Sequence, residues 1–484
     1  MRDETQTPEA PATPQRKLTP ANENPWYVLM TLYGEDQHAN RRAWNAWAGQ
    51  ALSSEEKREL AESSWSLLNA EADWEAIKSE VESRFESRSQ IKLTERLKIP
   101  SPMQIVNFAS FQFEERLDLM GMIFPSGVDF SGSRFSSGIW MNNAWLGGHP
   151  RFDHVQADET CVFSGARFVG RADFGSAKFL DGVEFDETVF CGDAYFSGVR
   201  FEGKSSFVCS YFKRKANFSN CNFEKSSIFR HAIFQSEVSF VTSVFVERSD
   251  FGEAVFAGDF EGKSRGKTSP TRFSAVDFKG ASNFGGAQFV SCYPDFIGAV
   301  LHDQTTFTRE APNRELWPDL PDQDTEHARD SCATIRHILA KQGLPEDEHF
   351  FFRREMHFAG KIGSIWQRLP YLLFGLFSEY GYSILRPTLW LLGVWALGFA
   401  AFWGYFSGCC VPAPHEMIER PMGSAMALSF SNLFPLFGFG RTFLLEELKV
   451  LPAVLQFFTG FQTVASLPLL FFLGLGLRQR FRLR

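Results

Sequence analysis

Residues 163–201 read FSGARFVGRADFGSAKFLDGVEFDETVFCGDAYFSGVRF, and each unit of five or six residues in this stretch opens with phenylalanine. Eighteen phenylalanines keep the alternation of five- and six-residue steps from Phe163 to Phe256. With 53 phenylalanines among 484 residues, chance does not produce so regular a series. A fixed period of this kind is the signature of a stacked repeat. The stretch therefore predicts a structural rod rather than a catalytic core.

The step length fits neither regular secondary structure. Steps of five and six residues would scatter the rings around a helix of period 3.6, and a strand has period 2. Gly, Ser, Asn and Asp are frequent between the rings and favour turns, so we expect short extended pieces joined by tight corners. A small residue lies two positions before each ring, which lets successive coils interdigitate. We expect the rings to stack in a single column, each contributing about 1.5–3 kcal/mol on burial.

These units resemble the pentapeptide-repeat family. Ala166-Arg-Phe168-Val-Gly170 and Ala177-Lys-Phe179-Leu-Asp181 match its small-x-Phe-x-x pattern, in the variant with an extra residue in alternate units. The resemblance implies a mainly β fold, a right-handed quadrilateral β-helix, over residues 101–310, with an insert loop at 258–272. Its structural ladder includes Phe163, Phe168, Phe174, Phe179, Phe185, Phe190, Phe196 and Phe201.

Composition and charge argue against several classes of function. The formal net charge of −8 argues against a nucleic-acid binder. Some pentapeptide-repeat proteins mimic DNA and inhibit topoisomerases, but that role needs a nearly continuous acidic face, and here Lys213-Arg214-Lys215 lies beside Glu202 and Glu224. The eight cysteines show no metal spacing, and no catalytic motif is present. We expect no enzyme activity, no metal and no cofactor, and we interpret His149 and His154 as solvated residues of the ladder.

Helices are predicted on both sides of the repeats. Residues 1–23 are rich in Pro, Thr and Glu and are expected to be disordered. Asn24-Pro25 and the Ser53/Glu56 capping box predict helix starts in a module at 24–100 that caps the rod. After the rod, a helical adaptor at 311–365 is predicted to contain helices at 325–342 and 346–361.

The C-terminal part is predicted to enter a membrane. Residues 388–406 and 451–477 carry no charge and are long enough to span a bilayer, whereas the mixed segment 366–387 suits the interface. Basic residues flank both spans outside the loop between them, which itself carries several glutamates. The positive-inside rule therefore predicts two spans in the inner membrane with both termini cytoplasmic.

The segment between the spans resembles the pore of two-span potassium channels. Residues 424–434 predict a short helix, and the channel-like domain 388–484 would place a filter-like motif directly after it. The motif consists of Pro435, Leu436, Phe437, Gly438, Phe439, Gly440 and Arg441. Phe437-Gly438-Phe439-Gly440 is similar to Val-Gly-Tyr-Gly. It departs from the family where Pro435 and Leu436 replace threonines and Arg441 replaces an acidic residue.

We therefore expect a bilayer-embedded ion channel, or channel relative, regulated through the repeat domain. The resemblance implies a homo-oligomer, a tetramer if it forms a pore, with a monovalent cation as permeant ion. A cytoplasmic protein partner would bind the rod, and no nucleic acid would. A non-conducting membrane-anchored scaffold is the alternative, and a DNA-mimic topoisomerase inhibitor a third. The redox state of Cys409 and Cys410 stays open.

Overall fold

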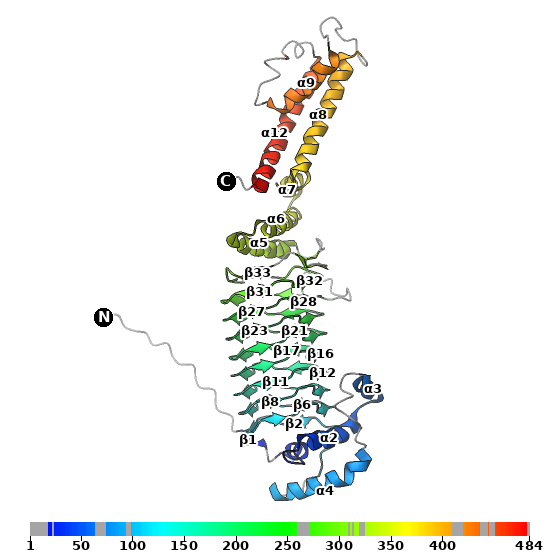
Figure 1. Ribbon diagram of the computed structural model, residues 1–484, viewed down its shortest axis with the longest axis vertical. Coiled ribbons are helices and arrows are strands. Elements are labelled where there is room, and N and C mark those ends of the chain that lie inside the picture. The colour runs from blue at the N-terminus through cyan, green and yellow to red at the C-terminus, as the bar shows by residue number, and fades with distance from the viewer. Residues whose placement is uncertain are drawn as a thin grey trace, which may run out of the picture. The chain divides into compact units, whose positions relative to one another are not determined.

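The structure is a computed structural model that describes residues 18–21, 24–62, 74–92, 98–258, 271–307, 310–311, 314–318, 325–408, 420–435, 444 and 451–481. The chain forms two compact units, Met1–Phe351 and Phe352–Arg484. The first unit contains a stack of parallel strands with helices at both ends, and the second is helical (Figure 1).

Four parallel sheets form a β-solenoid of about nine turns, which confirms the expected β-helix. Sheet A contains β1 (Thr19–Pro20), β3 (Phe111–Phe113), β7 (Arg134–Phe135), β10 (Gln156–Ala157), β14 (Lys178–Phe179), β18 (Arg200–Phe201), β22 (Asn222–Phe223), β26 (Val244–Phe245) and β30 (Asp277–Phe278). Sheet C contains β4 (Leu117–Asp118), β8 (Ile139–Trp140), β11 (Cys161–Val162), β15 (Val183–Glu184), β19 (Ser205–Ser206), β23 (Ser227–Ile228), β27 (Ser249–Asp250), β31 (Ser282–Phe284) and β33 (Thr306–Phe307).

The other two sheets complete each turn. Sheet D contains β5 (Ile123–Phe124), β9 (Trp145–Leu146), β12 (Arg167–Phe168), β16 (Val189–Phe190), β20 (Tyr211–Phe212), β24 (Ile233–Phe234), β28 (Val255–Phe256) and β32 (Gln288–Phe289). Sheet B contains β2 (Val106–Asn107), β6 (Val128–Asp129), β13 (Ala172–Asp173), β17 (Ala194–Tyr195), β21 (Ala216–Asn217), β25 (Val238–Ser239) and β29 (Thr271–Arg272), with a bridge at Arg151 joining β6 to β13.

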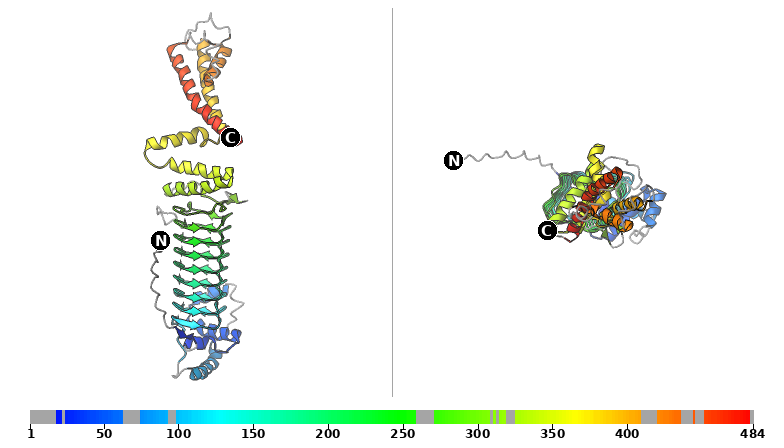
Figure 2. Two further views of the ribbon diagram at one scale, coloured as in Figure 1. Left: turned by 90° about the vertical axis from the view of Figure 1, so that its left-hand side faces the viewer. Right: turned by 90° about the horizontal axis from the view of Figure 1, so that it is seen from above.

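Successive turns pair in one register. Arg167 of β12 pairs with Val189 of β16, 22 residues later (189 minus 167), and Val189 pairs with Tyr211 after another 22. Four units of five or six residues make up this turn, so each unit supplies one strand to one sheet. Figure 2 shows the strands of successive turns lying above one another. After the insert the step becomes 23, from Arg272 to Asp295, which accounts for the one-residue slip visible in the sequence.

The rings stack in four columns, and the single column expected from the sequence is wrong. Stacked pairs with centroids 4.8–5.8 Å apart join Phe163 to Phe185, Phe168 to Phe190, Phe174 to Phe196 and Phe179 to Phe201. Each turn carries four units, so each face contributes its own ring, and a ring stacks only on the ring one turn away. Rings of different columns meet edge to face across the interior, as Phe174 and Phe185 do at 5.2 Å.

Helices cover the first turn of the solenoid. The N-terminal helices are α1 (Pro25–Met30), α2 (Gln37–Ala48), the 3₁₀ helix η2 (Gly49–Ala51), α3 (Ser54–Glu62) and α4 (Trp74–Lys92). Of these, α3 lies on the flank, where Glu59 pairs with Arg167 of β12 at 2.6 Å. The Asn24 side chain caps α1 by accepting from the amide of Trp26, and Ser53 and Glu56 form the expected capping box. Trp44 Nε1 donates to the carbonyl oxygen of Ile123 at 2.8 Å, satisfying a backbone group at the open end.

The expectation of disorder for residues 1–23 is wrong at Thr19 and Pro20. These residues form β1, which pairs in parallel with Phe111 and Gln112 of β3. The first strand of sheet A would otherwise expose unpaired backbone groups, and an edge position tolerates a proline. Composition alone did not reveal this pairing because it depends on the edge that the rest of the solenoid creates.

The last turn is covered from the other side. A short antiparallel pair, β34 (Glu310–Ala311) and β35 (Arg314–Glu315), precedes α5 (Thr325–Gln342) and α6 (Pro345–Ala359). The ring of Trp317 stacks on Phe289 at 4.7 Å and extends that aromatic column by one level. The face of α5 that carries Cys332, Ile335 and Leu339 is buried. Both ends of the described solenoid are therefore covered by other parts of the chain, and its flanks are left as the free surface.

The second unit contains α7 (Ile365–Ser378), α8 (Leu385–Phe406), α9 (Pro421–Leu433) and α12 (Ala453–Phe481). Figures 1 and 2 show α9 beside the two long helices, and α9 contacts both α8 and α12. At 13 residues, α9 is about 20 Å long and cannot span about 30 Å of hydrocarbon. The helix α7 contacts α8 and α12 and carries Pro370 in its first half.

Candidate functional site

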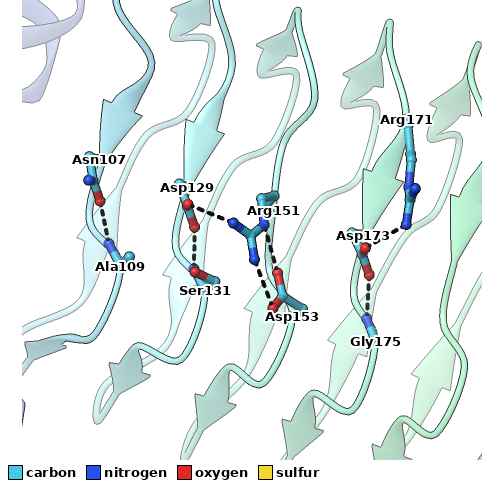
Figure 3. Close-up of polar contacts among 9 residues, drawn as sticks. All are labelled: Asn107, Ala109, Asp129, Ser131, Arg151, Asp153, Arg171, Asp173 and Gly175. Atoms are coloured by element: carbon cyan, nitrogen blue, oxygen red, sulfur yellow. Dashed lines mark hydrogen bonds and ion pairs between the residues drawn. The ribbon is translucent and has the colours of Figure 1, made fainter.

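One candidate surface is the sheet B flank of the solenoid, where polar residues occupy outward positions on successive turns (Figure 3). Arg151 lies between two carboxylates, 3.3 Å from Asp129 and 3.1 Å from Asp153. The hydrogen bond to Asp153 raises the pKa of the Arg151 guanidinium. On the next turn Arg171 pairs with Asp173 at 3.0 Å. These exposed pairs neutralise each other and give the flank alternating signs.

The same carboxylates also hold the corners of the solenoid. Asp129 accepts from the backbone amide of Ser131 at 2.8 Å, and Asp173 accepts from the amide of Gly175 at 3.0 Å. Asn107 makes the equivalent contact with the amide of Ala109 (Figure 3). Side chains that bond to the backbone two residues ahead are a standard corner device. The flank is therefore a polar surface suited to protein contact, and it lacks the continuous acidity of a DNA mimic.

The phenylalanines of the predicted ladder form the core of the solenoid. Phe163, Phe168, Phe174, Phe179, Phe185, Phe190, Phe196 and Phe201 are all buried. Burial raises the pKa of the Cys161 thiol to about 12, and it also raises that of Cys221. Both thiols are therefore protonated and inert at neutral pH. Among the described residues, no group of three His, Cys, Asp or Glu side chains could hold a metal ion.

The second candidate site lies in the helical unit. Helices α8 and α12 are the two described helices that have the length and apolarity to cross a bilayer. Their outer faces expose large apolar side chains: Leu397 is 68% and Phe457 80% exposed. Apolar surface of this extent is unfavourable in water and is compatible with lipid.

A buried polar cluster ties α9 to both long helices. Gln462 of α12 is fully buried, and its Nε2 donates to the carbonyl oxygen of Val394 at 2.9 Å and to Ser429 Oγ at 3.0 Å. Its Oε1 accepts from Asn432 Nδ2 at 3.0 Å. Ser429 Oγ in turn donates to the carbonyl oxygen of Trp395 at 2.7 Å. Through these bonds Gln462 reaches α8 and α9 at once.

A charged cluster marks the entrance to α8. Glu379 accepts a hydrogen bond from Arg353 of α6 at 2.5 Å, and its other carboxylate oxygen lies 3.8 Å from Arg386 of α8. Glu379 and Tyr380 both have left-handed backbone, with φ of 51° and 57°. Non-glycine residues adopt this conformation only when the surroundings enforce it. The Glu379 carboxylate thus links the adaptor helix to the start of the first apolar helix.

The structure places only part of the sequence-predicted pore motif. Pro435 lies two residues after the end of α9. Leu436, Phe437, Gly438, Phe439, Gly440 and Arg441 lie outside the described residues, as do Cys409 and Cys410. His149 and His154 are exposed on the solenoid. Sequence reasoning missed Gln462, Ser429 and Asn432. The signal was available, because isolated amides in an apolar segment mark a functional or packing role.

The comparisons concern the repeats. Residues 163–208 match the family model described as pentapeptide repeats (9 copies). No curated protein matches the chain, and no solved structure does. The matched segment lies in the middle of the solenoid, and the same turn length of 22 residues occurs upstream, from Gln112 to Arg134, and downstream, from Asn222 to Val244.

Proposed function

From a pentapeptide-repeat solenoid joined to two apolar helices, we propose a pore-forming membrane protein whose solenoid binds a cytoplasmic protein that regulates the pore. The observation that carries this proposal is the position of α9. It is a short helix held against both candidate spans by buried hydrogen bonds, and it ends at Leu433, just before the filter-like motif. Two-span channels use this order of span, short helix, loop and span.

Two features of the chain are those that a cation pore of this kind requires. A helix that ends inside the membrane presents the negative end of its dipole, which favours a cation nearby. Glycines such as Gly438 and Gly440 permit the dihedral angles that turn successive carbonyl oxygens toward an ion. One hairpin cannot surround an ion, so the active form would be a homotetramer. The departures at Pro435, Leu436 and Arg441 argue for weak potassium selectivity.

The proposed orientation in the membrane is based on the basic residues next to the two candidate spans. Arg353 and Arg354 precede α8, Arg386 lies in its first turn, and Arg478 and Arg480 lie at the end of α12. Both groups would face the cytoplasm of a cell whose inner membrane holds the spans. The solenoid would then also be cytoplasmic. A partner that binds its flanks would act on α6, and Glu379 would transmit the displacement to α8 through Arg386.

The test uses the purified full chain in planar bilayers. We expect cation current, and we expect Gly438→Asp to abolish it because a side chain there would obstruct the carbonyl-lined path. Gly404→Ala is the matched control, since no atom lies within 4 Å of the added methyl group. Absence of current from correctly inserted wild-type protein would overturn the pore proposal.

The departures in the filter-like motif favour one alternative, a membrane-anchored scaffold that conducts nothing. A scaffold keeps its function when both spans are exchanged for an unrelated anchor, and it has no need of four chains. A monomer by native mass spectrometry, together with full function after the exchange, would establish this alternative.

A further inference from the structure

Gln462 is the single side chain in the described part of the second unit that bonds to α8 and α9 simultaneously. Ser429 and Asn432 lie three residues apart on α9, so both face the same side of that helix. An amide suits this place because it donates and accepts at once, offering two N–H donors and an acceptor oxygen. Neither a serine nor a carboxylate could make all three contacts.

We propose that Gln462 is the positioning residue that sets the depth and rotation of α9 between the two spans. Asn432 lies one residue before the end of α9 at Leu433, so the contact with Gln462 fixes that end of the helix. The consequence for ion permeation rests on the proposed pore function, because the filter-like motif begins two residues after Leu433. The consequence for α9 itself does not depend on conduction.

Gly398 of α8 gives independent support for this role. A methyl group at Gly398 would lie 1.8 Å from Gln462 Nε2 and 2.5 Å from Ser429 Oγ. The absence of a side chain there lets the amide reach the α8 backbone. Gly393 and Gly404 on the same helix have no atom within 4 Å of an added methyl group. Among these three glycines, Gly398 faces the polar cluster, and its lack of a side chain makes room for the Gln462 amide.

The hydrogen bonds of Gln462 lie among apolar segments, where their loss is costly. Residues 387–408, 421–435 and 453–477 contain no Asp, Glu, Lys, Arg or His, and Tyr405 is the single tyrosine in these segments. In hydrocarbon a lost partner is not replaced by water, so a broken contact leaves polar groups unsatisfied. The wild-type cluster also contains no group that titrates near neutral pH. Any pH response must therefore come from a substitution.

The first measurement is hydrogen exchange of the α9 amides, with the full chain in lipid nanodiscs. Gln462→Leu has a similar size but removes every side-chain hydrogen bond, and we expect α9 exchange to rise by on the order of tenfold. Gln456→Leu is the matched control, an identical change on α12 at a residue whose amide donates to the carbonyl oxygen of Leu451, just before the same helix. Gly398→Ala should act like Gln462→Leu, and Gly404→Ala should act like wild type.

The second measurement separates hydrogen bonding from packing. Gln462→Glu retains a donor and an acceptor when its carboxyl group is protonated, and it loses the donor when ionised. Because a protonated carboxyl group has one O–H donor where the amide has two N–H donors, we expect α9 exchange at about pH 5 to lie between the values of wild type and Gln462→Leu, and to rise toward about pH 9. Wild type and Gln456→Leu should show no such additional change once the intrinsic pH dependence of exchange is subtracted.

The outcomes distinguish this inference from the pore proposal. Unchanged α9 exchange in Gln462→Leu would overturn the positioning role, and so would Gln462→Glu that behaves like Gln462→Leu already at about pH 5. Bilayer recordings of the same samples should show a shifted reversal potential in Gln462→Leu. Raised exchange with no current in wild type leaves Gln462 as the positioning residue and removes the pore. Raised exchange with unaltered permeation would overturn the step from α9 to the ion path.

Discussion

At the scale of the residue, the solenoid depends on which of two neighbouring positions faces inward. In β24, Phe234 is buried and stacks on Phe212 at 4.9 Å and on Phe256 at 5.2 Å, whereas Ile233 is 37% exposed. Side chains alternate across a strand, so adjacent residues of similar apolarity have very different effects. Phenylalanine suits the inward position because its flat ring stacks at the strand spacing of about 4.8 Å.

We predict that Phe234→Ala destabilises the solenoid by about 3–5 kcal/mol, because it opens a cavity in a column of stacked rings. Ile233→Ala is the control in the same strand, and its cost should stay below about 1 kcal/mol. Denaturant unfolding of the full chain in detergent, followed by the circular dichroism of the β-structure, measures both. Equal losses for the two variants would contradict the assigned inward and outward faces.

Residue patterns in the sequence did not reveal how the corners are made. Each five-residue step between Phe163 and Phe256 contains a left-handed residue, and several are not glycine, such as Glu187 with φ of 56° and His231 with φ of 55°. Glycine, asparagine and aspartate are the usual signals for this conformation. Here the pairing of the strands on either side enforces the corner, so the local sequence carries little trace of it.

At the scale of the element, the helices at both ends and the adaptor decide how the repeats are terminated and joined. Asn45 of α2 accepts from the amide of Ile123 and donates to the carbonyl oxygen of Gly121, reproducing the contacts of a missing turn. A repeat array needs such caps because each turn satisfies only its neighbours. The capping module could be predicted from its helix signals, but the residues that make the contacts could not.

The adaptor helix α6 provides a pH prediction. Burial lowers the pKa of His357, and the nearby Lys361 and Arg354 lower it further. The unfolded chain therefore binds more protons than the folded chain below the usual histidine pKa of about 6.5, and the free energy of unfolding falls as the pH drops through that value. Above it this contribution is constant.

We predict that His357→Gln reduces the loss of stability between about pH 7.5 and about pH 5.5, because glutamine does not titrate there. Thermal unfolding of the full chain in detergent at both pH values is the measurement. His337→Gln is a control on the adjacent helix, at an exposed residue. A variant that loses as much stability as wild type on acidification would contradict the assigned direction of the His357 pKa shift.

At the scale of the whole molecule, one chain combines a repeat domain with a polar, charged flank and a strongly apolar helical unit. The apolar faces of α8 and α12 require lipid or further copies of the chain to cover them. Pore formation requires the same hairpin to be repeated around an axis, which makes oligomeric state the most informative property of the intact protein.

We predict that the full chain stays in the membrane fraction after carbonate washing, and that removal of residues 388–484 releases it. In mild detergent, native mass spectrometry should give four copies of the 54.9 kDa chain. Release of the full chain by carbonate would contradict the membrane assignment, while a firmly inserted monomer would contradict only the pore.

The sequence by itself determined the repeat, its turn length and the two apolar helices, because these depend on the spacing of residue types along the chain. The repeat is visible in the spacing of the phenylalanines from Phe163 to Phe256, and the two apolar helices are visible as uncharged stretches. Tertiary structure alone decided the four ring columns, the strand at Thr19–Pro20 and the contacts of Gln462 with Ser429 and Asn432. Each of these joins residues distant in the chain, and its free energy exists only once the intervening turns or helices have packed.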